Sequence, residues 1–156
     1  MSYEIIKWVH ILSGIVLFGT GFGSAFYKFM ADRSHNLDNI AITNRHVVLA
    51  DWIFTTPTVF LQPLTGFWMA HERGFGFSSG WFMLAVGLFI FAGLCWLPVV
   101  WLQIRMRNDA QSALARSGQL PPRYQSDARL WFWLGIPAFS SMVAVVWLMV
   151  AQPALA

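Results

Sequence analysis

Four long apolar segments restrict this chain to one kind of fold. They cover residues 4–30, 46–70, 80–104 and 128–151, and each can cross about 30 Å of hydrocarbon as a helix. The chain is 57% hydrophobic and only 11% charged, whereas roughly a quarter of the residues in soluble domains are charged. The sequence therefore predicts an all-α, four-helix transmembrane bundle, in which residues 1–156 form a single integral membrane domain.

The linkers between these spans are polar. Residues 31–45 have mixed charge, residues 71–80 are rich in glycine and serine, and residues 105–127 form the longest linker. Within that linker, residues 108–116 have the composition of a short surface helix that ends before Pro121 and Pro122. Eight of the nine tryptophans fall near the ends of the predicted spans, as in the aromatic belts at membrane interfaces.

The basic residues are distributed unevenly between the two sides of the predicted bundle. Lys7 and Arg73 lie on the side of the termini. The other eight flank the first and third linkers: Lys28, Arg33, Arg45, Arg105, Arg107, Arg116, Arg123 and Arg129. Because basic residues concentrate in cytoplasmic loops, these two linkers are predicted to face the cytoplasm and both termini the periplasm. Charges in this place indicate contact with anionic lipid, and we expect no nucleic-acid partner.

One titratable side chain, His10, lies within the first apolar segment. At 100° per residue, Gly14, Leu17 and Gly21 fall within about 40° of the same helix face. The imidazole would then lie beside a groove from which two glycines remove side-chain bulk, and a planar cofactor could occupy it. A histidine inside a membrane is a functional-site hypothesis, as an axial ligand of haem iron or a ligand of copper. The plainer interpretation is an interfacial histidine that is hydrogen-bonded to a hydroxyl or a carbonyl.

The second segment carries a polar stripe along one face. With Gln62 as reference, six residues project within about 40° of it: Asp51, Thr55, Thr58, Gly66, Met69 and Arg73. Such a stripe must face the bundle interior or a water-filled cavity, because lipid cannot satisfy its polar groups. Matching depth along two antiparallel helices places His10 level with Thr65 and Gly66.

The remaining candidate ligands are few. Met69 carries a thioether that can bind haem iron or copper, although a core methionine is the simpler interpretation. Cys95 is the only cysteine, so neither an intrachain disulfide nor a thiolate cluster can form. No CxxCH motif occurs, so any haem must be bound non-covalently. His71 matches the depth of His10 but projects away from the polar stripe.

The first segment also resembles a known pattern, which here reads His10-Ile11-Leu12-Ser13, then Gly19, Gly21 and Phe26-Tyr27. It resembles the CopD-like group of small bacterial membrane proteins. That group includes HemJ-type protoporphyrinogen oxidases, copper-resistance CopD domains and a family of predicted integral membrane proteins of unknown function. The chain's size, its four segments and the stretch at 50–69 look closest to that last family.

This resemblance implies a location in the bacterial inner membrane and, from the HemJ branch, a haem b ligand at His10. HemJ-type proteins pair that histidine with a lysine on a later helix. This chain has no lysine after Lys28. It therefore departs from the HemJ pattern in the second axial ligand, and with it in the oxidase activity that the pattern implies.

Three functions follow as expectations. The first is a haem-b-binding membrane protein for electron transfer or oxidoreduction, with His10 as metal ligand and Gly14, Gly21, Gly66 and Met69 around the cofactor. The second is a copper-handling permease or chaperone that uses His10, Met69 and Met83. The third is a cofactor-free accessory or structural subunit, whose polar stripe joins helices. The lipid bilayer is the expected partner; a homo-oligomer is compatible with the sequence, and the substrate and the redox partner are left open.

The uneven distribution of basic residues predicts the topology directly. A reporter enzyme that folds only in the periplasm, fused after Ala156, should be active because both termini face outward. Activity of a strictly cytoplasmic reporter at the same position would contradict this orientation.

Overall fold

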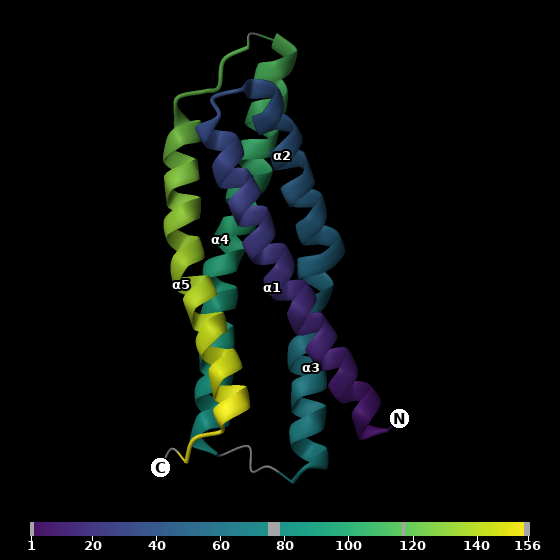
Figure 1. Cartoon of the computed structure of the whole chain (residues 1–156). Helices are drawn as coiled ribbons and strands as arrows, with labels where there is room; N and C mark the ends of the chain where they lie inside the picture. The colour runs from purple at the N-terminus through teal and green to yellow at the C-terminus, as the bar shows by residue number, and fades with distance from the viewer. Residues whose placement is uncertain (1, 75–78, 117, 155–156) are drawn as a thin grey trace.

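The computed structural model of the chain describes residues 2–74, 79–116 and 118–154, and it is a bundle of long helices (Figure 1). Four helical spans in the described residues are long and apolar enough to cross a membrane: Tyr3–Arg33, Leu37–Glu72, Gly80–Arg116 and Arg123–Ala151. The predicted all-α, four-helix transmembrane fold is therefore confirmed. Both termini lie at the same end of the bundle, as an even number of spans requires (Figure 1).

The helices follow one another with short connections. Their order is α1 (Tyr3–Arg33), α2 (Leu37–Ala50), the π-helical turn η1 (Asp51–Thr55), α3 (Thr56–Glu72), α4 (Gly80–Arg116) and α5 (Arg123–Ala151). Together α2, η1 and α3 form the second span. The last span begins directly after Pro122, five residues before the predicted start at 128.

The second span begins at Leu37 rather than at 46, so most of the predicted linker 31–45 is helical. Asn36 is the N-cap, and its side-chain oxygen accepts a hydrogen bond of 3.1 Å from the Asn39 amide. Beyond the cap, Ile40 and Asn44 lie on a face that is buried against the bundle. The hydropathy of 37–45 is too low for a span, but one buried face is enough to hold an amphipathic helix.

The third span is also longer than expected. The predicted surface helix at 108–116 is the end of α4, which runs for 37 residues, or about 55 Å. Met106 and Ala110 are fully buried, so the extension packs within the bundle. Gly118, at a φ of 70°, donates a hydrogen bond of 2.8 Å to the Ala113 carbonyl just beyond the helix end. The bundle therefore extends beyond the roughly 30 Å of hydrocarbon that it crosses.

A π-helical turn interrupts the second span at mid-length. The Thr56 amide donates to the Asp51 carbonyl, five residues earlier. Pro57, which follows immediately, has no amide hydrogen to donate and cannot continue a regular α-helical pattern through this turn. Thr55 donates a hydrogen bond of 2.8 Å to Asp51 Oδ1, so the widened turn holds a carboxyl group inside the bundle. Turns of this kind are frequent at functional sites.

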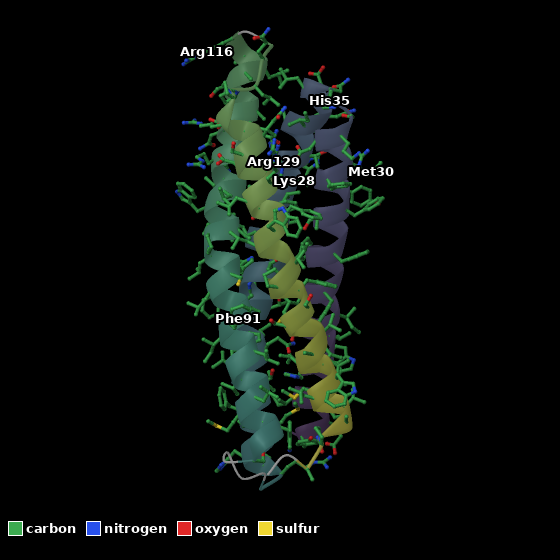
Figure 2. All side chains as sticks on the ribbon, turned by 90° about the vertical axis from the view of Figure 1, so that its left-hand side faces the viewer. Lys28, Met30, His35, Phe91, Arg116 and Arg129 are labelled. Carbon is green, nitrogen blue, oxygen red and sulfur yellow. The ribbon has the colours of Figure 1, made fainter. Side chains whose placement is uncertain are left out.

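The most extensive packing is that of α4 against α5, while α2 packs against α4 and α1, and α1 packs against α3. Between α1 and α5, the structure shows ring contacts of Phe139 with Phe18 and Phe22, and of Phe29 with Phe132. Apolar side chains project outward along the bundle, as Figure 2 shows, and Leu64 is 68% exposed. In a membrane protein these side chains face lipid.

Candidate functional site

The His10 imidazole is held by the second span at the depth that the sequence predicts. Its Nδ1 lies 2.7 Å from Thr65 Oγ1. The Thr65 hydroxyl donates its own hydrogen to the Leu61 carbonyl. With that hydrogen used for Leu61, Thr65 accepts from Nδ1, which is the tautomer in which Nε2 keeps its lone pair. This is the tautomer that binds a metal through Nε2, with a second group orienting the ring.

Gln62 joins the same two helices one turn from Thr65. Its Nε2 donates to the His10 carbonyl at 2.8 Å and to Ser13 Oγ at 2.6 Å. Ser13 in turn donates to the His10 carbonyl at 3.0 Å. Both amide hydrogens of Gln62 are thus used, and the polar stripe faces the bundle interior as predicted. Thr55, Thr58 and Asp51 of that stripe are buried as well. We call His10, Ser13, Gln62 and Thr65 the His10 cluster.

The glycines that were predicted to leave room for a cofactor have different surroundings. A Cβ atom at Gly66 would lie 3.4 Å from His10 Cε1, and one at Gly14 would lie 3.4 Å from Gln62 Nε2. These two glycines therefore allow protein side chains to approach closely. Gly21 lies eleven residues from His10, or about 16 Å along α1, and lines a separate central cavity. The structure thus brings Gly14 and Gly66 to the His10 cluster but not Gly21.

The methionines and the other histidine near this end differ in position. Met69 is half-buried, one helical turn beyond Thr65, whereas His71 is exposed. Met83 is 60% exposed on α4, so it does not point into the bundle with His10. Among the described residues, no group of three His, Cys, Asp or Glu side chains could hold a metal ion. A metal here would depend on His10 together with a ligand of another kind.

A bound haem requires an imidazole with a free lone pair and space for a planar ring. The first requirement is met, because the hydrogen-bonding pattern of Thr65 leaves Nε2 unprotonated. The space for a planar ring is available next to His10 only if side chains move, because Gln62 already lies against Gly14 and His10 against Gly66. His10 therefore meets the requirement for the imidazole, whereas the space for a ring beside it is filled by side chains.

The central cavity lies farther along the interior and has a volume of about 360 Å³. All four spans contribute to its wall. The lining includes Leu17 and Gly21 of α1, Asp51 and Thr55 of η1, Trp96 and Gln103 of α4, and Trp131 and Gly135 of α5. It is predominantly apolar, and two of its polar side chains, Thr55 and Gln103, approach Asp51.

A buried cation is the functional feature that the sequence analysis missed. Lys28 is 0% exposed, although it was counted among the residues that flank a linker. Its Nζ donates to Asp32 Oδ2 at 2.9 Å and to the Tyr124 hydroxyl at 3.3 Å. It also lies 5.3 Å from the centre of the Trp131 ring. Figure 2 shows Lys28 towards the end of the bundle that carries His35 and Arg129.

Tyr124 completes this cluster. Its hydroxyl donates to Asp32 Oδ1 at 2.7 Å and accepts from Asn44 Nδ2 at 2.6 Å. The group therefore links α1, α2 and α5, and we call Lys28, Asp32, Asn44 and Tyr124 the Lys28 cluster. The one local sequence pattern that indicated this cluster is the spacing of Lys28 and Asp32, which lie four residues apart on a helix.

Two further ion pairs join α4 and α5 at this end. Arg105 donates two hydrogen bonds to the Asp127 carboxylate, and Arg123 donates two to Asp109. With Lys28, three of the eight basic residues assigned to the cytoplasmic side thus have carboxylate partners. The orientation rule counts lysines and arginines irrespective of their pairing, so the predicted topology is unchanged.

A model of a protein family described as predicted integral membrane protein (DUF2269) matches residues 4–153, which is almost the whole chain. No curated protein matches the chain, and no solved structure does.

Gln62→Leu tests whether the polar stripe stabilises the bundle. The change removes two hydrogen bonds that join α3 to α1, so we expect the free energy of unfolding to fall by about 1–3 kcal/mol. Phe60→Leu is the matched control, because Phe60 is exposed on the same helix. Both are measured by unfolding in detergent micelles, followed by circular dichroism. Equal effects of the two changes would contradict the stabilising role.

Lys28→Met tests the buried cation in the same assay. Without Lys28, Asp32 loses its ion pair in a largely buried site, and we expect a loss of about 3 kcal/mol. Adding Asp32→Asn should restore much of the stability, because a neutral amide can still accept from Tyr124. Arg33→Met removes an equal charge from an exposed neighbour and should change little. A loss that Asp32→Asn fails to reduce would show that charge pairing is not the cause.

Proposed function

Because the chain belongs to this family of predicted integral membrane proteins, we propose a function that is carried out within the bilayer, the binding of haem b through His10. One observation carries it, the 2.7 Å contact between His10 Nδ1 and Thr65 Oγ1. That contact orients the ring and leaves Nε2 able to bind iron. Bound haem would supply one-electron chemistry, so the proposed activity is electron transfer or another oxidoreductase reaction.

The chain's own residues would hold and orient the group. Gln62 and Ser13 hold the backbone of His10, so the imidazole is positioned on a rigid part of α1. Lys7 and Arg73 belong to the same end of α1 and α3, and they offer positive charge for the two carboxylates of a haem. Met69 is the candidate second ligand, while Gly14 and Gly66 are the candidate contacts of the ring.

A cofactor-free accessory subunit is the second candidate. It is favoured by the close contacts at Gly14 and Gly66, where the polar side chains already satisfy one another. In that case the His10 cluster would serve only to join α1 to α3. The copper alternative has less support, because Met83 points away from the interior.

The proposed location is the bacterial inner membrane, with both termini in the periplasm. The His10 cluster would then lie towards the periplasmic side and the Lys28 cluster towards the cytoplasmic side. A haem there would be reached by periplasmic or membrane-soluble redox partners.

An absorption spectrum tests haem binding. Protein produced with ample haem should show a Soret band, and His10→Ala should abolish it while the protein remains folded and inserted, because the axial ligand is lost. His71→Ala is the control, since it removes an exposed histidine at the same end. Thr65→Val should weaken haem retention by roughly 10–100-fold, as expected for a group that orients a ligand.

The outcomes separate the alternatives. A wild-type protein without a Soret band, or a His10→Ala variant with the full band, would rule out haem binding through His10. A colourless protein that contains copper would support the copper alternative. A colourless protein without metal would leave the accessory subunit.

A further inference from the structure

Two residues that line the central cavity, Asp51 and Trp131, each have a buried polar atom without a hydrogen-bond partner. Asp51 is 6% exposed, and its Oδ2 has no hydrogen-bond partner, whereas Oδ1 accepts from Thr55. The Gln103 side chain also approaches this carboxyl group, without a hydrogen bond to Oδ2. Trp131 is 7% exposed, and its Nε1 also lacks a partner. A buried polar atom without a partner is unfavourable, so this cavity is suited to a ligand that supplies the missing bonds.

One of the two unpaired atoms is a hydrogen-bond acceptor and the other is a donor. The Asp51 carboxyl oxygen accepts a hydrogen bond, and the Trp131 indole can only donate one. A hydroxyl group both donates and accepts, and a ring with two hydroxyls carries one at each edge. An acyl chain of a lipid offers neither function. The polar atoms therefore favour a hydroxylated ligand over a hydrocarbon one.

The remaining wall of the cavity favours a flat ring. Phe18, Phe89 and Trp96 contribute aromatic faces, and Gly93 and Gly135 contribute positions without side chains. An added Cβ atom at either glycine would meet nothing within 4 Å, so both border open space. A volume of about 360 Å³ falls within the range of roughly 300–1,000 Å³ that small-molecule sites occupy.

Access to the cavity runs between α1 and α5. Phe22, Phe132 and Phe139 line the cavity and are also exposed on the outer surface of these helices. Aromatic contacts of Phe139 with Phe18 and Phe22 of α1 bridge this seam. Because the seam lies within the apolar spans, a ligand would enter from the lipid rather than from water.

We propose that the central cavity is a binding site for a lipid-soluble hydroquinone-type ring, with one hydroxyl donating to Asp51 and the other accepting from Trp131. The site is independent of any haem at His10, since the two lie in different parts of the bundle. The ligand enters through the seam between α1 and α5 and stacks against Trp96.

Binding of trimethylhydroquinone to the full chain in lipid nanodiscs tests the site. Titration calorimetry is performed under reducing conditions, and empty nanodiscs correct for partition into lipid. The dimethyl ether of the same compound is the control ligand, because it keeps the ring but has no hydroxyl to donate. We expect saturable binding of the hydroquinone and at least about tenfold weaker binding of the ether, from the lost hydrogen bond to a buried carboxyl group.

Two glycine variants on one helix serve as the matched pair. Gly93→Leu fills the cavity and should weaken binding by at least about tenfold, through loss of space and of stacking. Gly87→Leu also adds a side chain to α4 in open space, but outside the cavity, and should bind like the wild type. Gly135→Leu is the substitute if Gly93→Leu fails to fold. No saturable binding, equal binding of the ether, or undiminished binding by the cavity-filling variant would each overturn the assignment.

Discussion

Hydrocarbon offers no hydrogen-bond partner, and this constraint determines how the second span is used. Its polar side chains turn inward, and most of them find partners within the bundle. Gln62 donates both amide hydrogens to groups of α1. Thr65 accepts from His10 and donates to a carbonyl of its own helix. These bonds help to pair α1 with α3, because the hydrophobic effect does not drive helix association in lipid.

The interior is divided into three chemically different zones. Neutral hydrogen bonds surround His10 at one end, whereas ion pairs surround Lys28 at the other. Between them, the central cavity is mainly apolar and contains the unpaired oxygen of Asp51. Buried ion pairs are stable only when the two charged groups are well positioned. The long helices α4 and α5 pack closely beyond the apolar core of the spans and position such pairs there.

Much of this could be predicted from local patterns in the sequence. Hydropathy over windows of span length identified the four spans, because lipid exposure demands an uninterrupted apolar surface. Helical periodicity placed Gln62 inward, and antiparallel depth matching placed His10 level with Thr65 and Gly66, which the 2.7 Å contact bears out. The ends of the spans were less well predicted, since 37–45 and 105–116 are held by one buried face rather than by hydropathy.

Other features depend on residues that are distant in the chain. Lys28 is buried because Tyr124, 96 residues away, and Trp131 surround it, and no local pattern encodes those partners. The same holds for the central cavity, to which all four spans contribute. The sequence by itself determined the membrane-spanning fold and the depth of the histidine. Only the tertiary structure decided which polar groups are paired, because pairing depends on the distances between helices rather than on the order of residues along one of them.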